Sequence, residues 1–128
     1  AEAASVLECY GVGKLVHDFY TAAERSFSRI ASELGGLPRG ERWHRELLSD
    51  MALDIPKLRP PVLRRETRES LDGFLRFRHV FRNLYAFNLQ WEKVRALAEE
   101  VPEAWLELRA DLESFASSLD RIAADLES

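Results

Sequence analysis

Hydrophobic residues recur at intervals of three and four along most of the chain, the spacing that places apolar side chains on one face of an α-helix. The first such stretch covers about residues 3 to 34, and the glycines and proline of segment 35–40 are expected to end it. A shorter stretch covers residues 41–52 and stops near Pro56. The first half of the chain therefore predicts one long and one short helix.

The second half predicts two more helices. Pro60 and Pro61 suit a first helical turn, where a missing N–H is not needed, so a third helix is expected from there to about residue 87. Segment 88–92 predicts a turn with Asn88 as its candidate cap, followed by a fourth helix from about 90 to 127 that Pro102 should kink or divide. With no alternating strand pattern, the fold class is all-α, an antiparallel up-and-down four-helix bundle.

Composition places this bundle among soluble proteins. A chain of 128 residues with 46% hydrophobic and 31% charged residues fits a single globular domain over 1–128. No run of about 18 apolar residues and no secretory signal pattern occurs, so we expect a cytoplasmic protein without membrane contact. The single cysteine, Cys9, is expected to be a small buried residue, and no metal or cofactor is predicted.

Charge is distributed unevenly along the chain. Residues 57–82 carry eight lysines and arginines against three acids, whereas residues 99–128 carry nine acids against two arginines. The net charge of −4 therefore says less about a binding partner than the basic segment does.

The predicted third helix combines an apolar stripe with a polar arc beside it. The stripe consists of Phe74, Phe77, Phe81 and Leu84. The adjoining arc carries Arg78, His79, Arg82, Asn83 and Tyr85. One interpretation is that both arginines are solvated or paired with acids of the fourth helix, while His79 and Asn83 are merely exposed. The other is a phosphate-ester site, since arginine donors match phosphate oxygens and the rings can hydrogen-bond or stack.

The segment RHVFRNLY at 78–85 resembles the signature of HEPN-domain ribonucleases, and especially of HepT toxins. In that signature a polar residue follows an arginine directly, a histidine comes a few residues later, and in HepT toxins a tyrosine lies two places after the histidine. Arg78, His79 and Tyr85 match, whereas Asn83 stands in the place of the histidine. The segments WHRELL at 43–48, MALDIP at 51–56 and RPP at 59–61 extend the resemblance, which covers roughly residues 12–115.

The resemblance implies the toxin of a type VII-like toxin–antitoxin system. Such toxins are metal-independent endoribonucleases whose arginine helices face each other across the cleft of a homodimer. The implied catalytic positions are Arg78, His79 and Asn83, and the phosphate or RNA contacts are Arg78, Arg82 and Tyr85. The implied partner is an MNT nucleotidyltransferase antitoxin, which transfers AMP to the motif tyrosine, here Tyr85. The added phosphates would occupy the arginine donors that RNA needs.

Asn83 weakens the case for catalysis, because an amide cannot transfer protons as an imidazole does. His79 is the candidate to replace it; His44 is a weaker candidate, expected as a capping or surface residue, and His17 is expected as a core histidine. A catalytically inactive HEPN module that binds nucleotides or its cognate partner, and a helical protein whose arginine face docks an acidic surface, stay open as alternatives.

Two other features are not expected to bind ligands. The segment GVGK at 11–14 lacks the strand, spacing and following Ser or Thr of a P-loop, so its glycines are expected to allow close helix packing. Trp43, Trp91 and Trp105 are expected in the core or at an interface.

Overall fold

The structure, a computed structural model, describes residues 5–83 and 89–127. It contains four helices, α1 (Val6–Glu33), α2 (Trp43–Met51), α3 (Arg65–Asn83) and α4 (Trp91–Glu127). Within these residues the only β-structure is an isolated bridge between Ile55 and Arg59. The predicted all-α four-helix bundle is confirmed. None of the described helices is both long and apolar enough to cross a bilayer.

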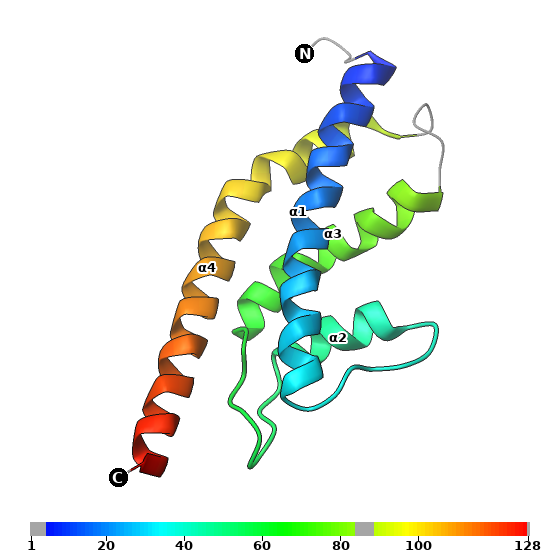
Figure 1. The fold of residues 1–128 in the computed structure, drawn as a ribbon. Helices are drawn as coiled ribbons and strands as arrows, with labels where there is room; N and C mark the ends of the chain where they lie inside the picture. Colours follow the sequence, from blue (N-terminus) through cyan, green and yellow to red (C-terminus); the bar gives the residue numbers. More distant parts are fainter. Residues whose placement is uncertain (1–4, 84–88, 128) are drawn as a thin grey trace.

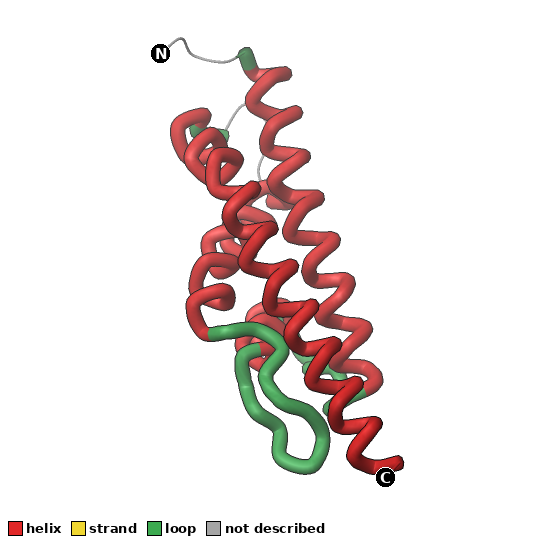
Figure 2. The backbone as a smooth tube through the Cα atoms, turned by 90° about the vertical axis from the view of Figure 1, so that its left-hand side faces the viewer, coloured by secondary structure: helices red, strands yellow, loops and turns green. Residues whose placement is uncertain are grey.

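The helices differ in length and direction. Figure 1 shows α1 and α4 running down the molecule together, with α3 crossing behind α1 in the opposite sense. The short helix α2 lies near the lower end of α1, and the connections before and after it are gathered at this end in Figure 2. Helix α2 therefore packs against only one end of the bundle.

Helix α1 starts after a cap at Ser5, which was not predicted, and ends before the glycines of segment 35–40, as predicted. The Ser5 hydroxyl accepts the backbone N–H of Glu8 at 3.1 Å and caps the first turn. After Leu34 the chain turns through Gly35 and Gly36, both with positive φ, and the Gly36 N–H donates to the carbonyl of Ala31.

The third helix begins at Arg65 and not near Pro60, so this part of the sequence prediction was wrong. In a helix starting at Pro60, the backbone N–H of Leu63 would donate to the Arg59 carbonyl. Instead, the N–H groups of Leu63 and Val62 both donate to the Met51 carbonyl at the end of α2. Arg59 is buried, and its guanidinium donates to four backbone carbonyls. These are the carbonyls of Leu34, Asp50, Leu53 and Pro60. The segment before α3 is thus a loop built around Arg59.

Helix α4 holds the start of α3 in place. The buried carboxylate of Asp111 accepts both the backbone N–H of Arg64, at 3.0 Å, and its side-chain Nε, at 2.7 Å. Helix α4 continues through Pro102, so the proline does not divide it. Figure 1 shows the helix bending in its yellow N-terminal part, near this proline, as a proline inside a helix favours.

The core joins all four helices. Its largest fully buried side chains include Tyr20 and Phe27 of α1, Leu47 and Met51 of α2, Leu71 and Phe74 of α3, and Val94 of α4. Cys9 is buried, as predicted. Trp43 and Trp91 pack against the core, whereas Trp105 is 46% exposed.

Gly13 sits at the crossing of α1 and α3. A Cβ atom there would lie 3.0 Å from Cε1 of Phe81, so the absence of a side chain lets the helices approach. This confirms close packing for one glycine of the GVGK segment; a Cβ at Gly11 would meet nothing within 4 Å.

Candidate functional site

Arg78 lies on the edge of the apolar face of α3, one turn after Phe74, and is only 9% exposed. Its guanidinium faces α1 and α2: Nη2 is 3.9 Å from Oε1 of Glu24, and Nη1 is 3.5 Å from Nε2 of His44. Its buried Nε has no hydrogen-bond partner among the described residues. The expectation that Arg78 is solvated or paired with an acid of the fourth helix was therefore wrong, since its acid belongs to α1.

Glu24 and His44 form the shortest contact of this cluster. Nδ1 of His44 lies 2.8 Å from Oε2 of Glu24, which is only 5% exposed. A carboxylate can only accept, so Nδ1 carries the proton; Arg78 can only donate, so it pairs with the lone pair of Nε2. Trp43 covers the imidazole, with the ring centroids 3.6 Å apart. His44 is thus fixed in one orientation and is not the capping or surface residue that we expected.

Sequence reasoning missed Glu24, although a signal was present. Tyr20, Glu24, Phe27 and Ala31 follow one another at helical spacing and are all buried on α1. An acid within such a stripe needs a partner, because a lone buried carboxylate is strongly disfavoured. The pattern could have predicted that Glu24 has a buried partner, but it could not have shown which residue that partner is.

Tyr20 lies one turn before Glu24 on α1, and the charges of Glu24 and Arg78 both influence its pKa. Its side chain is fully buried, and its hydroxyl makes no hydrogen bond among the described residues. Burial, with a smaller contribution from the Glu24 carboxylate, raises the pKa of Tyr20 above its usual range. Tyr20 therefore stays neutral.

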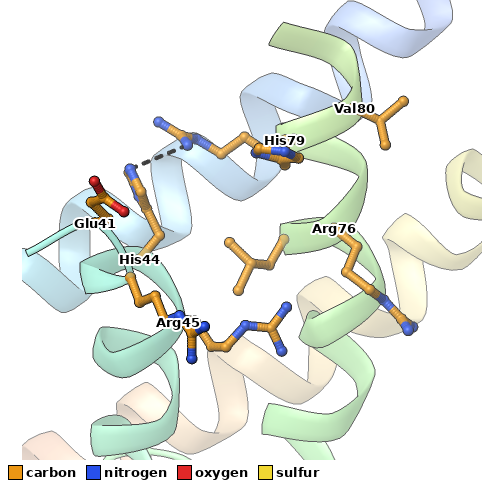
Figure 3. A pocket seen from close by; sticks show the side chains of 9 residues that line it. Glu41, His44, Arg45, Arg76, His79 and Val80 are labelled. Atoms are coloured by element: carbon orange, nitrogen blue, oxygen red, sulfur yellow. Dashed lines mark hydrogen bonds between the residues drawn. The ribbon is translucent and has the colours of Figure 1, made fainter. Parts of the chain in front are cut away.

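A groove of about 470 Å³ opens over Arg78 between α2 and α3. Figure 3 shows Glu41, His44 and Arg45 on one side of it, and Arg76, His79 and Val80 on the α3 side. The full lining is Glu41, Arg42, His44, Arg45, Leu75, Arg76, Arg78, His79 and Val80. Four arginines and two histidines against one acid make this groove suited to an anionic ligand.

Of the other predicted site residues on α3, His79 lines this groove and Asn83 does not. His79 is exposed and lines it, next to Arg78. Asn83 is exposed outside the lining, and its amide donates to the backbone carbonyl of His79 at 2.7 Å. Asn83 is therefore occupied by its own helix.

Arg82 belongs to a different contact. Its Nε donates to Nε2 of His17 at 3.1 Å, and Nδ1 of His17 lies 3.1 Å from Oδ1 of Asp18. His17 is 9% exposed and hydrogen-bonded, as predicted for a core histidine. The structure does not bring Arg82 into the groove with Arg78. Tyr85, the predicted modification site, lies outside the described residues.

Comparison with known proteins identifies the family. A family model described as HepT-like protein matches residues 11–119, which include most of α1, all of α2 and α3 and most of α4. No curated protein and no solved structure matches the chain significantly. Because the family model spans well over half of the sequence, the chain belongs to the HepT-like protein family.

Proposed function

We propose that this HepT-like protein is the toxin of a type VII-like toxin–antitoxin pair, and that it binds and cleaves RNA at the groove between α2 and α3 without a metal ion. The proposal includes a homodimer and an MNT nucleotidyltransferase antitoxin that transfers AMP to Tyr85. The family supports the toxin assignment. The groove supports the choice of an anionic polymer as the ligand.

The observation that carries the proposal is the state of Arg78. Within segments 5–83 and 89–127, its guanidinium has acceptors at 3.5 and 3.9 Å, and its Nε has none. A phosphate oxygen bonded to arginine typically lies at about 2.7 to 2.9 Å, so it would satisfy this guanidinium better than the present contacts do. Arg42, Arg45 and Arg76 line the same groove and would extend the contact along the backbone of the strand.

A matched pair of arginines tests this groove. Arg76 lines it and pairs with Asp72 at 3.4 Å, while Arg109 lies on α4 outside it and pairs with Glu113 at 2.9 Å. Both are exposed and in i, i+4 pairs. We expect Arg76→Gln to weaken binding of single-stranded RNA and to reduce the slope of log K against log salt by about 0.7, the value for one lost phosphate contact.

Fluorescence anisotropy at several salt concentrations measures both quantities, and gel analysis in EDTA measures cleavage. The Arg109→Gln variant should bind and cleave as the wild type does. Equal behaviour of the two variants, or a wild type that neither binds nor cleaves RNA, would contradict the proposal.

Asn83 favours a second candidate, a module that binds RNA or nucleotides but does not cleave them. Its amide cannot transfer protons, and it is hydrogen-bonded to the His79 carbonyl. In that case the wild type would bind RNA without cleaving it, and Asn83→His would introduce cleavage.

A further inference from the structure

We infer that His44, oriented by the buried carboxylate of Glu24, is the general base of this ribonuclease and supplies the proton transfer that Asn83 cannot. The inference rests on the proposed function, because it assigns a residue to the RNA cleavage proposed above. Its basis is the arrangement of Glu24, His44 and Arg78 at the groove.

Glu24 holds the imidazole of His44 in one orientation. Glu24 accepts from Nδ1–H of His44 at 2.8 Å, so the lone pair of the neutral ring is on Nε2. A carboxylate that fixes the tautomer and stabilises the imidazolium formed later is the arrangement by which histidine bases are commonly activated. Glu24 acts through His44 and is a positioning residue.

Nε2 of His44 lies beside the guanidinium of Arg78. It lies 3.5 Å from Nη1 of Arg78, at the outer limit of a hydrogen bond, and both residues line the groove. A phosphate held by Arg78 would bring the neighbouring ribose close to Nε2. The 2′-hydroxyl can replace the long Arg78 contact at little cost, because that contact is weak.

The other histidines are less suited to this role. His79 also lines the groove, but it is exposed, and its Nδ1 faces the Asn83 amide at 3.5 Å instead of a carboxylate. His17 is engaged by Arg82 and Asp18 and does not line the groove. Among the three, His44 is the one with both a buried carboxylate and access to the groove.

In the proposed reaction, the 2′-hydroxyl of the RNA attacks the adjacent phosphorus. The 2′-hydroxyl gives its proton to Nε2 of His44 while its oxygen bonds to phosphorus, and the bond from phosphorus to the 5′-oxygen breaks. Protonated His79, on the opposite wall, gives its proton to the leaving 5′-oxygen. The products are a 2′,3′-cyclic phosphate and a 5′-hydroxyl, and the two imidazoles return to their starting states by proton exchange with water. Arg78 stabilises the charge on the phosphorane.

The test separates binding from chemistry. Single-turnover cleavage of single-stranded RNA is measured beside binding of DNA of the same sequence, which lacks the 2′-hydroxyl and is not cleaved. We expect His44→Gln to slow cleavage about 100-fold or more, as for loss of a general base, with DNA binding within about threefold of wild type. Ser49→Ala, an exposed change on the same helix, is the control and should cleave normally.

Rescue distinguishes a chemical role of His44 from a structural one. Added imidazole should restore part of the activity of His44→Ala, whereas pyrazole, a ring of the same size and a much weaker base, should not. Glu24→Gln, which retains an acceptor for Nδ1–H, should lower the cleavage rate less than His44→Gln does.

The outcomes are distinct. Cleavage by His44→Gln at the wild-type rate, or equal rescue by both rings, would overturn the role of His44 and leave the ribonuclease proposal in place. A wild type that fails to cleave RNA would overturn the cleavage itself, and the role of His44 with it.

Discussion

Tyr20 lies one turn before Glu24 on α1 and carries a buried hydroxyl without a hydrogen-bond partner among the described residues. A buried, unsatisfied polar group destabilises the folded state, so we expect Tyr20→Phe to raise the free energy of unfolding by about 1 kcal/mol. Urea unfolding of the two proteins at neutral pH measures this difference. A loss of stability would mean that the hydroxyl is bonded.

The pKa of Tyr20 adds a pH dependence to that prediction. Because burial raises this pKa in the folded state, ionisation of Tyr20 has no effect on folding below about pH 10, the unfolded value, and increasingly favours the unfolded state as the pH rises above it. Above that pH the wild type should therefore lose more stability than Tyr20→Phe. The comparison cancels the other tyrosines and lysines, which titrate alike in both proteins.

At the same scale, the sequence predicted a role for Arg78 and His79, which both line the groove, but it did not predict the residues that Arg78 contacts. Glu24 and His44 are 20 residues apart, and Arg78 is 34 residues from His44. Helical periodicity shows which face of a helix is apolar, but it does not show which side chains of different helices meet. The orientation of His44 depends on its contact with Glu24 of another helix, so it could not be predicted from the sequence.

Among the elements, the crossing of α1 and α3 can be tested with two glycines of one helix. Gly11→Ala and Gly13→Ala should gain the same helix propensity, about 1 kcal/mol, but only at Gly13 does the new Cβ meet Phe81. We expect Gly13→Ala to be less stable than Gly11→Ala by at least about 1 kcal/mol, as in an overpacked core.

Thermal and urea unfolding of both variants measure that difference. Equal stabilities would show that Phe81 moves aside without cost. Recovery in the double variant Gly13→Ala, Phe81→Leu would assign the loss to this contact.

The number, order and type of the helices could be predicted because each carries a regular apolar stripe. The start of α3 could not, since it depends on contacts between distant segments. The Met51 carbonyl, the Arg59 guanidinium and the Asp111 carboxylate together hold the residues before Arg65 out of the helix. Pro60 and Pro61 are compatible with a loop and with the first turn of a helix, so local preference did not show where α3 begins.

For the whole molecule, the net charge of −4 conceals a basic and an acidic region. Arginines of α2 and α3 line the groove over Arg78, whereas Glu100, Glu103 and Glu107 of α4 line a separate hollow against α3. An acidic protein can thus carry an arginine-rich groove beside an acidic hollow, with Arg76 lining both.

Tyr85 provides a test of the proposed toxin pair at this scale. We expect incubation with the cognate nucleotidyltransferase and ATP to add one or more AMP groups to Tyr85, and to abolish RNA binding because the added phosphates occupy the arginines. Native mass spectrometry measures both the added mass and the number of chains, expected to be two. Tyr85→Phe should stay unmodified; modification of that variant elsewhere, or none in the wild type, would contradict the prediction.

The loop around Arg59 connects the two helices that line the groove. Arg59 and the Met51 carbonyl tie the C-terminal end of α2 to the chain that leads into α3, while His44 stands at the other end of α2. The two walls of the groove are thus joined before any ligand arrives. Less binding free energy is then lost in ordering the protein, and a short stretch of nucleotides can bind without a large conformational change.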